Sequence, residues 1–265
     1  MKSNIVSRKD WIAARKQLLK KEKESIRLLD EISAERRKLP WVEIDKDYVF
    51  EGPSGKVKLA DLFAGRTQLV VYHFMFGPDW EEGCPSCSLV SDHFDGTLPH
   101  LAARDVSFVA ISRAPLAKLE AFKKRMGWKF NWVSSNGSDF NTDFHVSFTK
   151  EEVASGKVHY NYGVEAHPST EAPGLSVFCK DEDGRIFHTY STYSRGLDPF
   201  MTTYRFLDVV PKGRDEDHLE FSMEWVRYHD SYGTNQFADA DKPYWPTVEA
   251  ATATSCACST AEAHA

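Results

Sequence analysis

The sequence lacks the features of membrane and secreted proteins. A membrane-spanning helix needs about 18 consecutive apolar residues, and no apolar run in the 265-residue sequence approaches that length. The first residues also lack the apolar stretch of a secretory signal. Cysteine is scarce, with five in the chain, which is too few for a disulfide framework in a protein of this size. We therefore expect a cytoplasmic protein without membrane contact, whose cysteines are reactive thiols.

Positive charge is not in excess either. The formal net charge is −6 at pH 7, so the whole chain has no general attraction to nucleic acid. Basic residues are dense between residues 8 and 38, where Ile12, Leu19 and Ile26 recur at heptad spacing. This pattern predicts an amphipathic helix, within an N-terminal extension over residues 1–40, that packs on the protein's own body. Formation of a homodimer through the helix is the alternative.

The most informative motif is Cys84-Pro85-Ser86-Cys87, which follows an apolar run over residues 68–76. Residues three apart on a helix share one face, so two thiols at this spacing can form a disulfide with little backbone movement. Pro85 suits the first helical turn, where its missing N–H costs nothing. A strand, a loop and C-x-x-C at a helix start therefore predict a dithiol redox site. A helix N-terminus favours the thiolate of Cys84 as the nucleophile and leaves Cys87 as the resolving thiol.

Acidic residues just before the motif oppose the formation of a thiolate on Cys84. Asp79, Glu81 and Glu82 precede Cys84, and negative charge nearby raises the pKa of a thiol. The sequence alone leaves the net direction of the pKa shift open.

Apolar periodicity predicts an α/β fold around this motif. The expected elements are strands over 68–76 and 106–112, each followed by a helix, then a hairpin over 175–190 and a closing helix over 198–210. Strand–helix alternation implies right-handed crossovers on a mainly parallel sheet. Aromatic residues crowd residues 128–170, which we interpret as an insertion of short elements. The domain is expected over residues 41–232, with a flexible tail over 233–265.

This order of elements resembles the thioredoxin fold, and at closer range the uncharacterised thioredoxin-like family known as domain-of-unknown-function family 899. The resemblance implies a central mixed β-sheet flanked by helices. In thioredoxin-like proteins a cis proline before the third core strand faces the dithiol, which implies the same place for Pro173 after Ala172. The resembling stretches cover most of residues 7–232 and include residues 35–41, 72–80, 83–88, 112–115, 125–128 and 140–144.

The other cysteines and one arginine are further candidates for site residues. Cys179 lies in an apolar strand and is interpreted as a small buried residue. Cys256 and Cys258 in the tail could relay electrons or bind a soft metal, or could be an incidental pair. Arg195 follows the last hairpin strand and is interpreted as a surface or structural residue. Glu81 stands three residues before Cys84, so the Thr-x-x-Cys motif of peroxiredoxins is absent.

These observations predict a thiol–disulfide oxidoreductase that uses Cys84 and Cys87, with Pro173 as a third site residue. Its expected partners are a protein or small-molecule disulfide and an unidentified electron donor, and it needs neither cofactor nor metal. Two alternatives stay open at this point. One is a non-enzymatic thioredoxin-fold module that binds a metal or a protein, and the other is a peroxide reductase in which Cys84 forms a sulfenic acid.

Overall fold

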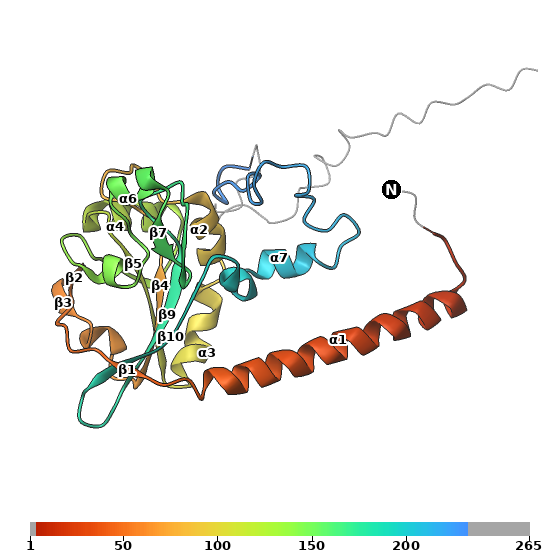
Figure 1. Cartoon of the computed structure of the whole chain (residues 1–265), viewed down its shortest axis with the longest axis horizontal. Helices are drawn as coiled ribbons and strands as arrows, with labels where there is room; N and C mark the ends of the chain where they lie inside the picture. Colours follow the sequence, from red (N-terminus) through yellow and green to blue (C-terminus); the bar gives the residue numbers. More distant parts are fainter. Residues whose placement is uncertain (1–3, 233–265) are drawn as a thin grey trace, which may run out of the picture.

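A computed structural model describes residues 4–232, and within them an eight-stranded sheet forms the centre of the molecule (Figure 1). Its strands follow the order β1-β10-β9-β4-β5-β6-β2-β3, and a separate two-stranded sheet pairs β7 with β8. The strands are β1 (Val42–Glu43), β2 (Val49–Gly52), β3 (Gly55–Lys58), β4 (Gln68–His73), β5 (Val106–Ser112), β6 (Asn131–Ser134), β7 (Val158–Tyr160), β8 (Gly163–Glu165), β9 (Gly174–Lys180) and β10 (Ile186–Tyr193).

Helices flank this sheet and connect its strands. The α-helices are α1 (Arg8–Arg36), α2 (Pro85–Ser91), α3 (Leu98–Ala102), α4 (Leu116–Arg125), α5 (Phe140–Asp143), α6 (Lys150–Ser155) and α7 (Thr202–Leu207), and the 3-10 helices are η1 (Asp61–Phe63), η2 (Asp95–Thr97) and η3 (Ser194–Phe200). Strands β4, β5 and β6 run parallel, whereas β9 is antiparallel to β4 and forms a hairpin with β10. The predicted thioredoxin-like α/β fold, a mixed sheet flanked by helices, is confirmed. The sheet is not mainly parallel as expected, because in its described strands the parallel pairs are β4–β5 and β5–β6 and the other pairs are antiparallel.

Two hydrophobic cores lie on opposite faces of the sheet, because successive side chains of a strand point to opposite faces. On one face Tyr72 packs with Cys87 and with residues of α2 and α4. On the other face His73 stacks on Phe140 and Phe144, with ring centroids 5.6 and 5.8 Å apart. The aromatic insertion contributes to both cores, so its aromatic density is used mainly for packing.

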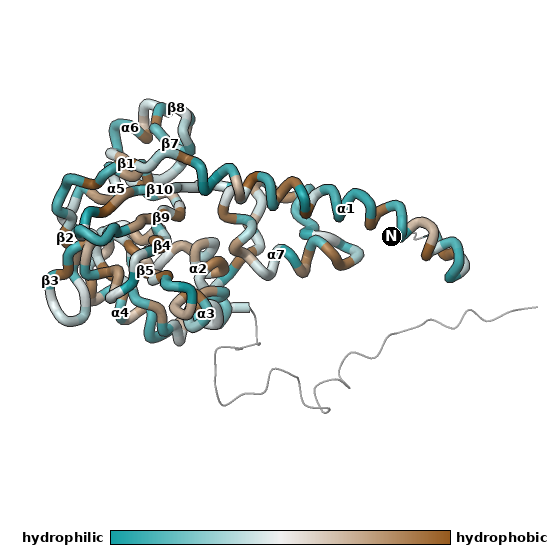
Figure 2. The backbone as a smooth tube through the Cα atoms, turned by 90° about the horizontal axis from the view of Figure 1, so that it is seen from below, coloured by the Kyte–Doolittle hydropathy of each residue, from teal (hydrophilic) through white to brown (hydrophobic). Residues whose placement is uncertain are grey.

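Helix α1 forms as predicted but does not pack on the body. The side-chain oxygen of Ser7 accepts a hydrogen bond from the backbone N–H of Asp10 and caps its N-terminus. No side chain of α1 is buried, and the helix projects from the sheet as a separate arm (Figure 1). Hydrophobic positions alternate with hydrophilic ones along it (Figure 2). This apolar stripe is too narrow for a helix face that must cover a core, and the prediction of docking on the protein's own body is wrong.

The closing helix predicted over residues 198–210 is two shorter elements, η3 and α7. Pro199 lies inside η3, and Met201 between the two is extended, with φ −102° and ψ 90°. Residues 211–232, here called the C-terminal strap, follow as turns and extended segments and return to the region of α2 (Figure 1). The tail predicted over 233–265, with Cys256 and Cys258, lies outside the described residues. Among residues 4–232 no helix is both long and apolar enough to span a membrane.

Candidate dithiol site

Cys84 caps the N-terminus of α2, where the sequence predicts it. Its backbone is extended, with φ −60° and ψ 129°, and Pro85 opens the first helical turn. The sulfur of Cys84 accepts a hydrogen bond of 3.5 Å from the backbone N–H of Cys87. The backbone N–H of Cys84 in turn donates to the carbonyl of Met75, at 3.0 Å. These bonds hold the motif against the chain that leaves β4.

The second thiol is enclosed by the core. Cys87 is 2 % exposed, and both cysteines are free thiols. The hydroxyl of Tyr72, from β4, lies beside the thiol of Cys87. Tyr72 is fully buried, and its hydroxyl has no hydrogen-bond partner of good geometry within residues 4–232. A buried hydroxyl without a fixed partner is costly, so this group is available to a charge that develops on Cys87.

The two thiols differ strongly in acidity. The pKa of Cys84 is lowered from 9.0 to about 7, chiefly by a hydrogen bond from the Cys87 thiol, while burial opposes the shift. Backbone N–H groups of Cys87 and Ser86 lower it further. Burial raises the pKa of Cys87 well above its usual range, and the neighbouring Cys84 adds to this effect. At neutral pH the thiolate of the pair therefore resides on Cys84.

Ion pairs offset two of the three acidic residues that precede the motif, Glu81 and Glu82. Glu81 pairs with Lys118 at 2.9 Å, and Glu82 pairs with Arg125. Both basic residues belong to α4, which follows β5 in the sequence. The pKa-raising effect expected from the sequence is thus compensated by cations that are distant in the sequence.

Pro173 lines the same cavity as the two cysteines, but its peptide bond is not the expected one. No cis bond occurs within residues 4–232, so the prediction of a cis bond after Ala172 is wrong. Trans is the favoured form of an X–Pro bond, and hydrogen bonds from the insertion fix the residues on either side of it. The N–H of Ala172 donates to the carbonyl of Val146 at 2.9 Å, and the hydroxyl of Tyr160 donates to the carbonyl of Pro173 at 2.7 Å.

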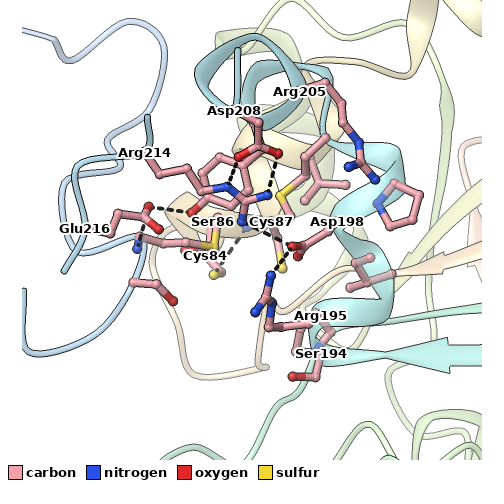
Figure 3. Close-up of a pocket in the computed structure, with 18 of the residues that line it drawn as sticks. Cys84, Ser86, Cys87, Ser194, Arg195, Asp198, Arg205, Asp208, Arg214 and Glu216 are labelled. Carbon is pink, nitrogen blue, oxygen red and sulfur yellow. Dashed lines mark hydrogen bonds and ion pairs between the residues drawn. The ribbon is translucent and has the colours of Figure 1, made fainter. Parts of the chain in front are cut away.

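A cavity of about 1190 Å³ opens above the dithiol. Cys84, Cys87, Tyr72 and Pro173 line it from the sheet and α2, and the remaining lining comes mainly from η3, α7 and the C-terminal strap. Figure 3 shows the two sulfur atoms below a group of charged side chains. Sequence analysis missed this charged wall, because its residues are brought together from η3, the end of α7 and the C-terminal strap, and no single segment indicates that they meet.

The charged wall is connected by ion pairs. Arg214 binds Asp208 through two hydrogen bonds, of 2.7 and 3.0 Å, and reaches Asp198 at 3.2 Å. Arg195 also pairs with Asp198, at 3.1 Å (Figure 3). Arg195 therefore lines the cavity, and its guanidinium bonds to this wall carboxylate. Cys179 is half-buried on β9 and is not among the residues that line the cavity.

The sequence and the fold were compared with those of known proteins. The family model described as "Bacterial protein of unknown function (DUF899)" matches residues 1–232. No curated protein matches the sequence. Among solved structures, peroxidoxin BcpB from Mycobacterium tuberculosis is similar at 15% identity, with a TM-score of 0.41, over 63% of this chain and 97% of that chain. Peroxiredoxin Q from Xanthomonas campestris is similar at 13% identity, with a TM-score of 0.42, over 63% of this chain and 98% of that chain. Similarity at this level indicates nothing about activity.

Proposed function

The chain belongs to the family of bacterial proteins of unknown function DUF899, and we propose that it is a thiol–disulfide oxidoreductase whose reacting groups are Cys84 and Cys87. The observation that carries this proposal is the asymmetry of two free thiols in one cavity. Cys84 has a pKa lowered to about 7, whereas burial raises the pKa of Cys87. Thiol–disulfide exchange through a mixed disulfide requires one thiol that attacks as a thiolate. It also requires a second thiol that stays protonated until the mixed disulfide has formed.

The reaction proceeds in two balanced steps. In the first, the thiolate of Cys84 attacks one sulfur of a disulfide, a bond forms between Cys84 and that sulfur, and the other half leaves as a thiolate that takes up a proton. In the second, Cys87 loses its proton and attacks the sulfur of Cys84. The Cys84–Cys87 disulfide forms, and the second half of the substrate leaves as a thiol. Two cysteine thiols are oxidised, and one disulfide is reduced to two thiols.

Tyr72 supports the second step. Cys87 is buried in an apolar core, so its thiolate needs a hydrogen-bond donor in place of water. The hydroxyl of Tyr72 lies beside that thiol and has no fixed partner within the described residues. It donates a hydrogen bond to the Cys87 thiolate as the proton leaves, and so acts as a positioning residue for resolution.

Pro173 lines the same cavity as the two cysteines. Its role as a site residue stays a prediction, with the ring limiting how a disulfide approaches Cys84. Replacement by alanine tests this role, because the carbonyl that binds Tyr160 is kept while the ring is lost.

A redox titration with and without zinc tests the proposed function against metal binding. Within residues 4–232 no group of three or more His, Cys, Asp or Glu side chains is arranged to hold a metal ion. The protein is equilibrated in dithiothreitol buffers of graded potential, and free thiols are counted by alkylation and mass measurement. We expect one two-electron couple, absent in Cys84→Ser and unchanged by zinc. Thiols that stay reduced at every potential, or stoichiometric zinc binding that blocks oxidation, would reject the proposal.

A further inference from the structure

The outer half of the C-terminal strap is bound directly to the region of the dithiol. The hydroxyl of Tyr228 donates a hydrogen bond of 2.7 Å to the carbonyl of Gly83. Asp230 accepts two hydrogen bonds from Arg125 of α4, of 2.8 and 3.1 Å. His229 bonds to Asp92, the residue after α2, at 2.7 Å. These three consecutive side chains fix the strap to both helices that flank the motif.

The carboxylate of Glu216 connects the inner half of the strap to α7 by hydrogen bonds. One oxygen of Glu216 accepts hydrogen bonds from the hydroxyl of Tyr204 at 2.7 Å, the indole N–H of Trp225 at 2.6 Å and the backbone N–H of Met223 at 3.2 Å. The guanidinium of Arg214 stacks 4.0 Å from the ring centroid of Tyr204. Residues 212–217 of the strap, with Ser222 and Met223, therefore form a wall of the cavity, and the outer half anchors this wall beside the dithiol.

Both thiols lie in this cavity rather than on an open surface. Cys87 is almost fully buried, and Cys84 is half-buried. The space above them, about 1190 Å³, exceeds the range typical of sites for small molecules. A small disulfide can enter such a space and reach Cys84. A disulfide on the convex surface of a folded protein meets the wall first.

The charges of the wall indicate a polar occupant. The cavity is lined by cations such as Arg205 and Lys212 and by acids such as Glu165 and Asp215. Charged side chains of both signs suit a substrate that carries ammonium and carboxylate groups, and they disfavour an apolar one that would desolvate them.

We infer that the substrate is a low-molecular-weight polar disulfide, such as the disulfide of a small thiol peptide, and that the strap excludes disulfides of folded proteins. This inference rests on the proposed function and specifies the substrate class of the same two cysteines. The strap selects substrates by their size, because it blocks the approach of large disulfides to Cys84 and contributes no reacting group.

Mixed-disulfide formation by Cys87→Ser tests the inference with two probes, oxidised glutathione and insulin. Rates are read by intact-protein mass and normalised to the rates at which the small dithiol dithiothreitol reacts with the same disulfides. We expect the normalised rate for glutathione to exceed that for insulin by about a hundredfold. In wild-type protein, iodoacetamide should label Cys84, whereas a maleimide carrying a large polyethylene glycol chain should not.

A strap variant separates size exclusion from intrinsic reactivity. Asp230→Ala in the Cys87→Ser background removes two bonds to Arg125, and the insulin rate should rise about tenfold while the glutathione rate changes less than about twofold. Asp181→Ala, in the β9–β10 turn, is the matched control and should alter neither rate. Equal normalised rates for both probes, or rapid labelling by the large maleimide, would overturn the size restriction alone. No adduct with either probe would overturn the proposed function as well.

Discussion

The hydroxyl of Tyr228 donates a hydrogen bond of 2.7 Å to the carbonyl of Gly83, the residue directly before Cys84 and 145 positions away in the sequence. Gly83 is itself packed tightly, because a Cβ atom there would lie 2.6 Å from the ring of Phe74. The peptide that precedes Cys84 is thus fixed by the core on one side and by the strap on the other.

Replacement of Tyr228 by phenylalanine should loosen the strap with little loss of global stability. The ring would keep its edge contact with Phe122, but one hydrogen bond would be lost, which costs about 1 kcal/mol of unfolding free energy. We expect faster amide hydrogen exchange in residues 211–232. Tyr162→Phe is a matched control, since it removes a tyrosine bond to the Ser191 carbonyl, away from the strap. Unchanged exchange in the strap of the Tyr228 variant would contradict this role.

The acidity of Cys84 should depend on Cys87. Alkylation of Cys84 by iodoacetamide, followed against pH, should show a midpoint near pH 7, because the pKa is lowered to about 7 chiefly by the hydrogen bond from the Cys87 thiol. Cys87→Ala removes that donor and should move the midpoint upward. The rate at neutral pH should fall as the thiolate fraction falls. An unchanged midpoint in the variant would show that the backbone N–H groups alone set the acidity.

Replacement of Tyr72 by phenylalanine should slow resolution and leave stability unharmed. A buried hydroxyl without a fixed partner lowers the stability of the folded state, so its removal from the core should be neutral or stabilising by about 1 kcal/mol. The attack of Cys87 on a mixed disulfide should slow about tenfold or more, because a hydrogen bond to a charged group is lost. Rapid-quench measurement of the adduct's decay gives this rate.

Tyr193→Phe provides the contrast for Tyr72. The hydroxyl of Tyr193 is buried and donates to the carbonyl of Phe144 at 3.1 Å, so its removal should lower the unfolding free energy and leave resolution unaffected. If Tyr72→Phe behaves like Tyr193→Phe, the Tyr72 hydroxyl has a structural role only.

The stability of the protein should fall in mild acid because of His73. This side chain is 1 % exposed, and burial lowers its pKa from 6.5 to about 3. Between those values the unfolded chain binds a proton that the folded protein does not, so unfolding becomes easier as pH falls through 6.5. The slope from this group approaches about 1.4 kcal/mol per pH unit.

Urea denaturation at several pH values between about 7 and 5 measures this effect. His73→Gln should lose less unfolding free energy than wild type over the same interval, since glutamine does not titrate. The remaining slope includes His188, whose pKa is also lowered by burial. Parallel pH profiles for the variant and wild type would show that His73 does not titrate differently on folding.

The core of the fold could be predicted because its signals are local. The apolar run over residues 68–76 and the spacing of Cys84 and Cys87 identify a strand and a helix start without knowledge of distant contacts. The helix over residues 8–36 is equally clear from composition and periodicity. The sequence does not show that this helix fails to pack on the body, because packing depends on which surface the fold leaves open.

The features that shape the site arise from contacts distant in the sequence. Lys118 and Arg125 of α4 pair with Glu81 and Glu82 before the motif, and no pattern near Cys84 indicates these partners. The C-terminal strap has no periodicity that would place Tyr228 beside Gly83. The cis bond at Pro173 was expected only from the resemblance to thioredoxin-like proteins, since no pattern in the neighbouring residues indicates either isomer. The structure has this bond in the trans form that X–Pro bonds favour.

Trapping of the mixed disulfide tests the central assignment most directly. Cys84→Ser and Cys87→Ser are each exposed to oxidised glutathione, and adducts are measured by intact-protein mass. If Cys84 attacks and Cys87 resolves, Cys87→Ser should accumulate one glutathione adduct on Cys84, whereas Cys84→Ser should trap nothing at Cys87. Wild type should pass to the internal disulfide. Equal trapping by both variants, or none by either, would contradict the assignment of Cys84 as nucleophile and Cys87 as resolving thiol.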